Sequence, residues 1–233
     1  MEANAGIRPG GKVGLTFAKE SVSSKGDVQY DIGMQYGTIV EFLLEGSFPF
    51  ENLYYETGIS YFQKGIKTSF ESRVPPDDVG SFSTVSVFDR DRLGYIDIPF
   101  DLKYKIPLNN HLKVYGTFGG YFDIAVEGKN ASGCDFLLKS DLVYPGHSGQ
   151  LSGYENDTKI KFGTGSNDKY KRIDCGFRFG VGFEAVNHIL LGVTYSMGLN
   201  NIYNNNYQPG PAINPVYSSV KNRVWSLYIA YLF

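Results

Sequence analysis

The chain has 233 residues and a formal net charge of −2, which excludes a strongly basic nucleic-acid-binding domain. Aromatic residues make up 15% of the sequence and glycine accounts for 28 positions, while two cysteines are too few for a disulfide scaffold. No run of about 18 apolar residues exists, so no transmembrane helix is predicted. A membrane-spanning form would have to be a closed β-barrel, which also pairs every backbone polar group.

Eight segments alternate between apolar and polar residues with a period of two, which predicts β-strands with one apolar face. In chain order they cover residues 11–18, 38–46, 53–66, 96–105, 111–126, 173–184, 189–199 and 223–233. Short turns follow the second, fourth and sixth segments, at residues 47–52, 107–110 and 186–188. Long polar connections follow the others, at residues 19–36, 67–92, 127–169 and 200–221. We therefore predict one domain: an all-β, eight-stranded antiparallel up-and-down transmembrane β-barrel with long extracellular loops and short periplasmic turns.

The last segment shows the pattern of a lipid-facing strand most completely. Its outer face begins with Trp225, continues with Leu227 and Ile229, and ends with Tyr231 and Phe233. Rings at both bilayer interfaces with aliphatic residues between them are typical of membrane barrels. Seven residues on the apolar faces form the predicted lipid-facing girdle: Tyr55, Tyr61, Tyr104, Tyr195, Trp225, Tyr231 and Phe233.

A soluble lipocalin-like, ligand-binding barrel is the alternative, with apolar residues inside and polar residues outside. The polar faces of segments 173–184 and 189–199 favour the membrane barrel, because they are mostly Gly, Ser and Thr rather than solvated Lys and Glu. Small residues fit the crowded lumen of an eight-stranded barrel. Met1 is not followed by a signal segment. We expect that segment to have been removed from a protein of the bacterial outer membrane.

Several strand motifs make a family resemblance specific. The chain resembles the porin-like outer-membrane β-barrel family common in Bacteroidetes, sometimes called PorT-like. The similar stretches are residues 60–67, 94–99, 115–121, 174–184 and 195–202 and the final Tyr231-Leu232-Phe233. The resemblance implies an outer-membrane barrel of the OmpX size class and carries over no catalytic residues. Members differ most in their loops, so the resemblance implies no specific function.

The polar faces of the segments carry charges of both signs, which would point into the lumen. Buried charges are costly unless they are paired and hydrogen-bonded. The charges would therefore form an interlocked plug, or alternatively line a path for ions or small solutes through a narrow pore. The predicted lumen charge network consists of Glu41, Glu45, Glu56, Lys64, Asp97, Asp101, Lys103, Lys105, Lys113, Asp123, Asp174, Arg178 and Glu184.

No motif predicts catalysis, a cofactor or a metal site. Residues 180–185 match the dinucleotide-binding pattern G-x-G-x-x-A, but they lie inside an alternating strand rather than in a strand–turn–helix unit. His111, His147 and His188 are scattered without metal-ligand spacing. We predict a non-enzymatic protein without cofactors; an enzyme whose site forms in the loops is the alternative.

The long loops are the predicted sites of interaction, for binding, adhesion or docking with other outer-membrane or envelope proteins. The other expected partner is outer-membrane lipid, and nucleic acid is not expected. Aromatic residues in the loops either form a recognition surface or pack the loops on each other. These residues are Phe82, Phe88, Phe136, Tyr144, Tyr154, Tyr203, Tyr207 and Tyr217.

The two cysteines leave two interpretations open. Cys134 and Cys175 would both lie toward the extracellular end, where a disulfide can form. Alternatively, Cys175 is a free thiol that acts as a small hydrophobic side chain on the apolar face of its strand.

Overall fold

The computed structural model describes residues 6–19, 21–22, 27–44, 52–74, 82–139, 148–152, 156–207 and 219–233. All regular elements among these residues are β-strands. Within the same ranges, no helix is long and apolar enough to cross a membrane.

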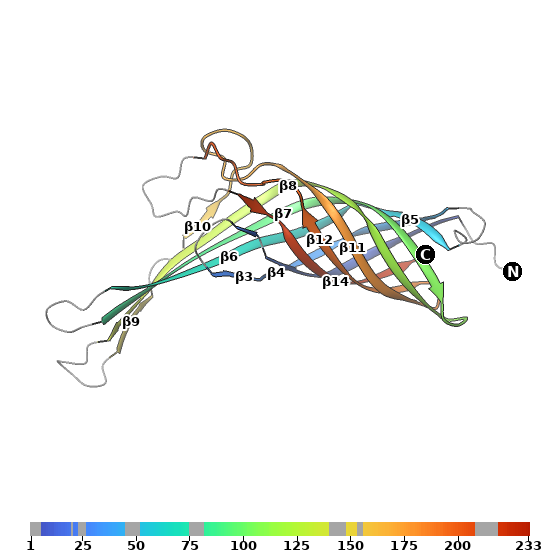
Figure 1. The fold of residues 1–233 in the computed structure, drawn as a ribbon, viewed down its shortest axis with the longest axis horizontal. Helices are drawn as coiled ribbons and strands as arrows, with labels where there is room; N and C mark the ends of the chain where they lie inside the picture. Colours follow the sequence, from blue (N-terminus) through green and yellow to red (C-terminus); the bar gives the residue numbers. More distant parts are fainter. Residues whose placement is uncertain are drawn as a thin grey trace.

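Eight strands close into a ring in which each strand is antiparallel to its neighbours (Figure 1). In ring order these are β1 (Ile7–Ala18), β4 (Asp31–Leu43), β5 (Leu53–Thr57) with β6 (Ser60–Val74), β7 (Phe82–Pro107), β8 (Leu112–Lys139), β11 (Ile173–Ala185), β12 (Ile189–Gly198) and β14 (Arg223–Leu232). β5 and β6 are two pieces of one barrel strand, because both pair with β4 and with β7. The predicted eight-stranded up-and-down barrel is confirmed.

Five short strands lie outside the ring. β2 (Ser21–Val22) pairs with β13 (Val220–Lys221), and β3 (Asp27–Gln29) pairs with β6. β9 (Ser148–Ser152) and β10 (Asn156–Lys159) both pair with β8. β3, β9 and β10 extend the barrel sheet beyond the ring, whereas β2 and β13 form a separate two-stranded sheet.

The last strand, β14, closes the barrel. It pairs with β12 on one side and with β1 on the other, where Trp225 lies opposite Phe17 and Tyr231 opposite Gly11. Trp225 and Tyr231 are 45% and 49% exposed, whereas Tyr228 is buried. The alternation in the sequence of β14 therefore separates an apolar outer face from a face that points into the barrel. Because the ring of eight strands is closed, it has no free strand edge.

The two ends of the barrel differ. The start of β1 and the end of β14 lie at one end of the barrel, where Gly10 pairs with Leu232, and the tight β7–β8 and β11–β12 turns lie at the same end (Figure 1). In the β11–β12 turn, Val186 and Asn187 have φ values of 53° and 62°, and the His188 amide donates to the Ala185 carbonyl over 3.1 Å. Two consecutive residues with a left-handed backbone conformation form a hairpin turn whose twist matches that of the two flanking strands. We call this the turn end and the opposite one the loop end.

At the loop end, the structure corrects the prediction of long polar connections. Residues 67–92 and 127–169 are partly strand, since β6 runs to Val74, β7 begins at Phe82 and β8 runs to Lys139. Figure 1 shows these strands and β9 projecting beyond the ring. Backbone pairing continues there without the apolar alternation, because a sheet beyond the bilayer no longer has a lipid-facing side. Pro75 and Pro76, residues that stop a central strand, lie outside the described residues.

Of the two interpretations of the cysteines, the pairing register excludes the disulfide. Cys175 is a free thiol and lies opposite Phe122 of β8. Cys134 lies on the same strand opposite Val87, twelve residues beyond Phe122. At a rise of about 3.3 Å per residue the separation is far larger than the roughly 7 Å that two bridged Cα atoms can span.

Candidate functional site

Toward the turn end, a group of ion pairs lies in the lumen around the Glu41 carboxylate. Lys103 donates from Nζ to Glu41 Oε1 over 2.7 Å, and Arg8 lies 3.2 Å from Oε2. Lys105 also forms an ion pair with Glu41, and Lys103 forms a second one with Glu56. Three cations therefore share one fully buried carboxylate.

Glu184 continues this group toward the hairpin turn. Its carboxylate lies 2.5 Å from Lys105 Nζ, 3.0 Å from Arg8 and 3.6 Å from Lys113. The Lys113 side chain is 28% exposed, so it lies at the rim rather than inside. Arg8 joins Glu41 and Glu184 and links β1 to β4 and β11.

A second group of ion pairs centres on Lys64. This buried ammonium pairs with Asp123 and lies 2.9 Å from Asp174. Asp174 also accepts hydrogen bonds from Tyr121 over 3.2 Å and from Asn222 over 2.7 Å. The Tyr121 ring centroid lies 4.6 Å from the ammonium, which adds a cation–π contact.

Arg178 crosses the lumen beside this second group. Its guanidinium donates twice to Asp97, over 2.5 and 3.3 Å, and once to Ser196 over 3.1 Å. All three side chains are buried. Such a forked charge pair combines strong hydrogen bonds with fixed geometry.

Between the two groups lies a cavity of about 10 Å³, lined by residues that include Lys12, Gln35, Asp101, Thr117 and Tyr228. That volume fits about one water molecule. Lys12 and Asp101 are buried and face this cavity, and neither belongs to an ion pair recorded among the described residues. The Lys12 ammonium lies 5.4 Å from the centroid of the Tyr228 ring.

The structure thus brings together most of the charges that the alternation pointed inward. Glu45 lies outside the described residues, and Asp101 faces the cavity rather than an ion-pair partner. Arg8 and Lys12 were missed. Lys12 already lies on the polar face of the segment 11–18 with Thr16, and extending the alternation of this segment to residue 7 would have added Arg8 to the same inner face.

A further set of polar side chains lies at the loop end. Asp91 accepts a hydrogen bond from the Tyr170 hydroxyl over 2.6 Å and lies 2.6 Å from Lys169 Nζ. Asn130 donates to both Asp89 and Asp91. Burial raises the pKa of the Asp89 carboxyl, and the neighbouring Asp91 carboxylate raises it further. The alternating sequence at residues 89–92, with acids inward and arginines outward, could have revealed this set.

An apolar cluster packs across the loop end beside these charges. It joins Leu93 and Tyr95 of β7 to further apolar side chains, among them those of Ile160, Tyr170, Ile202, Tyr203 and Val220. Tyr203 belongs to this cluster and Tyr207 packs against it, so these two loop aromatics pack rather than form a recognition surface. The side chains of Phe82, Phe88 and Phe136 are not described, and Tyr144, Tyr154 and Tyr217 lie outside the described residues.

The seven residues of the predicted girdle lie on the outer face. Tyr195 and Trp225 pack with ring centroids 4.8 Å apart toward the loop end, and Tyr231 and Phe233 with centroids 5.4 Å apart toward the turn end. Tyr55, Tyr61 and Tyr104 lie on β5, β6 and β7. We call the outward-facing apolar surface between the two levels the apolar belt.

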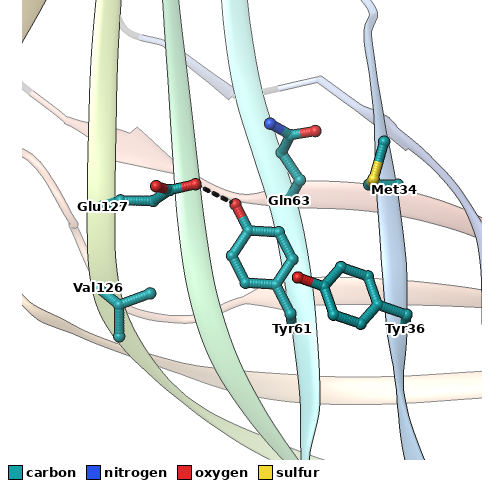
Figure 2. A pocket seen from close by; sticks show the side chains of 6 residues that line it. All are labelled: Met34, Tyr36, Tyr61, Gln63, Val126 and Glu127. Atoms are coloured by element: carbon teal, nitrogen blue, oxygen red, sulfur yellow. Dashed lines mark hydrogen bonds between the residues drawn. The ribbon is translucent and has the colours of Figure 1, made fainter.

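An open pocket lies on the outer wall at the loop-end edge of the apolar belt. Figure 2 shows its six lining residues, Met34, Tyr36, Tyr61, Gln63, Val126 and Glu127. The cavity volume is about 500 Å³. We call it the wall pocket.

Tyr61 reaches across β7 to donate a hydrogen bond to Glu127 Oε1 over 2.5 Å (Figure 2). Its ring also stacks on Tyr36, with centroids 5.2 Å apart. Gly94 of β7 permits this crossing, because a Cβ there would lie 2.5 Å from the Tyr61 hydroxyl.

A β-bulge in β8 shapes the same region. Gly94 pairs with Glu127 but Tyr95 pairs with Ala125, which leaves Val126 as an extra residue. Val126 and Glu127 are both exposed on the outer wall, so the facing of β8 is reversed beyond this point. Sequence alternation did not predict the bulge.

The chain belongs to the outer membrane protein beta-barrel domain family, whose model matches residues 3–204. The protein is therefore located in the bacterial outer membrane, embedded in lipid, with its turn end periplasmic and its loop end extracellular. This assignment rules out the soluble lipocalin-like alternative.

Three solved proteins are similar to the chain at low identity. The attachment invasion locus protein Ail of Yersinia pestis is 10% identical, with 97% of this chain and 99% of that chain covered and a TM-score of 0.31. The Neisserial surface protein A is 11% identical, with 98% of each chain covered and a TM-score of 0.37. OprG of Pseudomonas aeruginosa is 12% identical, with 97% and 94% covered and a TM-score of 0.35. No curated protein matches the chain significantly.

Proposed function

We propose that this protein is a closed, non-enzymatic barrel whose extracellular segments serve binding, adhesion or docking with other envelope proteins. The observation that carries the proposal is the length of two strands. A tilted transmembrane strand needs about 9–11 residues, but β7 has 26 and β8 has 28. Since the outward apolar residues end at Ile96 on β7 and at Val126 on β8, about half of each strand is available outside the bilayer as a sheet that projects from the cell surface.

The interior supports a closed barrel rather than a pore. Two groups of ion pairs occupy the lumen, and an apolar cluster packs across its extracellular end. Interlocked side chains of this kind fill an eight-stranded barrel. There are two rival assignments. Steady conductance would support a narrow pore for small solutes, and measured turnover would support an enzyme with its site in the loops.

We also infer that the chain belongs to the PorT-like, porin-like group common in Bacteroidetes. This finer assignment depends on the sequence motifs, among them residues 60–67 and 115–121 and the final Tyr231-Leu232-Phe233.

The proposal is tested by shortening the projecting hairpin. Residues 71–86 are replaced with Asn-Gly, a two-residue hairpin turn that joins Phe70 to Val87, which are paired in the ladder. The variant should still run faster on gels when unboiled, because the closed ring remains. It should lose the envelope proteins that co-purify with the intact protein in mild detergent.

The matched control is Asn110→Gly, which places the same Asn-Gly sequence at residues 109–110 in the periplasmic turn. This variant should retain those proteins. An unchanged set of co-purifying proteins after the hairpin is shortened would refute the binding role of this sheet.

A further inference from the structure

Cations face outward on neighbouring strands just beyond the apolar belt. Arg92 of β7, Lys129 of β8 and Lys159 of β10 are all exposed. Lys129 faces outward because the bulge at Val126 reverses the facing of β8. We call Arg92, Lys129 and Lys159 the cationic row.

The pairing register places these three charges directly beside one another. Arg92 pairs with Lys129, and Lys129 pairs with Lys159 on its other side. Two residues further from the membrane, Lys67 of β6 pairs with Arg90 of β7. Like charges directly opposite each other on one face of a sheet are destabilising. A row of three is therefore unfavourable unless an anion lies over it.

The protein neutralises only one end of this surface. Asp31 pairs with Arg90 and lies 3.7 Å from Arg92 Nε. The nearby carboxylate of Glu127 accepts the Tyr61 hydroxyl. Among the side chains that the structure describes, no carboxylate forms a recorded ion pair with Lys129 or Lys159.

The row lies just beyond the apolar belt, on the side of the lipid headgroups. On β7 the outward apolar residues end at Ile96, four residues or about 13 Å along the strand from Arg92. On β8, Val126 lies three residues before Lys129. Strand tilt shortens these spans along the membrane normal, and the polar zone on each side of the hydrocarbon is roughly 5–8 Å thick. The wall pocket lies between the apolar belt and the row.

We propose that the cationic row binds the phosphate groups of lipid headgroups in the outer leaflet. Lys129 and Lys159 pair with the phosphate. Gln63 and Glu127 of the wall pocket accept hydrogen bonds from the sugar or glycerol hydroxyls, and Met34 and Val126 contact the start of an acyl chain. The graded surface, apolar then polar then cationic, matches a phosphorylated amphiphile that lies along the barrel wall. A soluble polyanion would use the charges but not the pocket.

The test compares two double variants that remove the same charge. Lys129→Gln/Lys159→Gln removes two cations of the row, and Lys19→Gln/Lys221→Gln removes two cations at the loop-end rim. Each protein is delipidated in a non-ionic detergent, titrated with diphosphoryl lipid A and followed by native mass spectrometry. The unchanged protein and the rim variant should bind one lipid with equal affinity. The row variant should bind about tenfold more weakly, as expected for the loss of two charge-assisted contacts.

Two further measurements separate the proposal from simpler explanations. Thermal unfolding without lipid should show the row variant as stable as the unchanged protein or more so, because removing like charges relieves repulsion; this excludes misfolding as the cause of weaker binding. Inorganic polyphosphate should bind more weakly than lipid A. Equal lipid affinity of both double variants, or tighter binding of polyphosphate than of lipid A, would overturn the proposal.

Discussion

Replacing Arg178 with methionine is expected to lower the free energy of unfolding by about 3–5 kcal/mol, because it leaves one partner of a buried ion pair uncompensated. Arg178 donates twice to Asp97, which is buried in the lumen. Methionine fills part of the same space but leaves the Asp97 carboxylate without its cation. The urea midpoint, read from the gel shift between folded and boiled protein, measures the effect.

Two controls show whether the missing pair causes the loss. Lys113→Met removes a cation at the rim whose partner Glu184 keeps Arg8 and Lys105, so its cost should stay below about 1 kcal/mol. Adding Asp97→Asn to Arg178→Met should recover much of the lost stability, since no unpaired charge then remains. Equal midpoints for Arg178→Met and Lys113→Met would contradict the assigned role of Arg178.

Replacing Phe179 with arginine is expected to cost about 2–4 kcal/mol of insertion free energy, the range for a cation on the lipid face near the bilayer midplane. Phe179 lies at the centre of β11, is 43% exposed and packs beside Tyr195 with ring centroids 5.3 Å apart. The yield of folded, heat-modifiable protein after refolding into vesicles measures the loss.

Ser166→Arg is the matched control, because this exposed residue lies in the segment between β10 and β11 rather than in a barrel strand. Its yield should equal that of the unchanged protein. If both arginine variants fold equally well, the outer face of β11 does not contact lipid.

The barrel strands were predictable because lipid imposes a simple rule on them. Positions 225, 227, 229 and 231 of β14 and the following Phe233 all had to be apolar, since each faces hydrocarbon or its interface. Beyond the bilayer this rule ends, and the extensions of β6, β7 and β8 were expected as loops although their backbones remain paired.

The direction in which a charged side chain points was also easier to predict than its ion-pair partner. Alternation placed Lys64 and Arg178 inward, but their partners come from distant parts of the chain: Asp174 is 110 residues from Lys64, and Asp97 is 81 residues from Arg178. The acid that each cation contacts depends on how the strands are staggered around the closed ring. No single segment of the sequence encodes that stagger. The bulge at Val126 likewise decides the facing of Lys129 without a signal in the local pattern.

The closed lumen is the central claim, and single-channel recording in a planar lipid bilayer tests it most directly. The ion pairs of Lys64, Arg178 and Glu41 and the apolar cluster at the extracellular end leave room at mid-height for a cavity of about 10 Å³. The intact protein should therefore give no steady current in salt solution, and Arg178→Met should give at most brief, small openings. A large and stable current through the unchanged barrel would contradict the closed lumen and identify the protein as a pore.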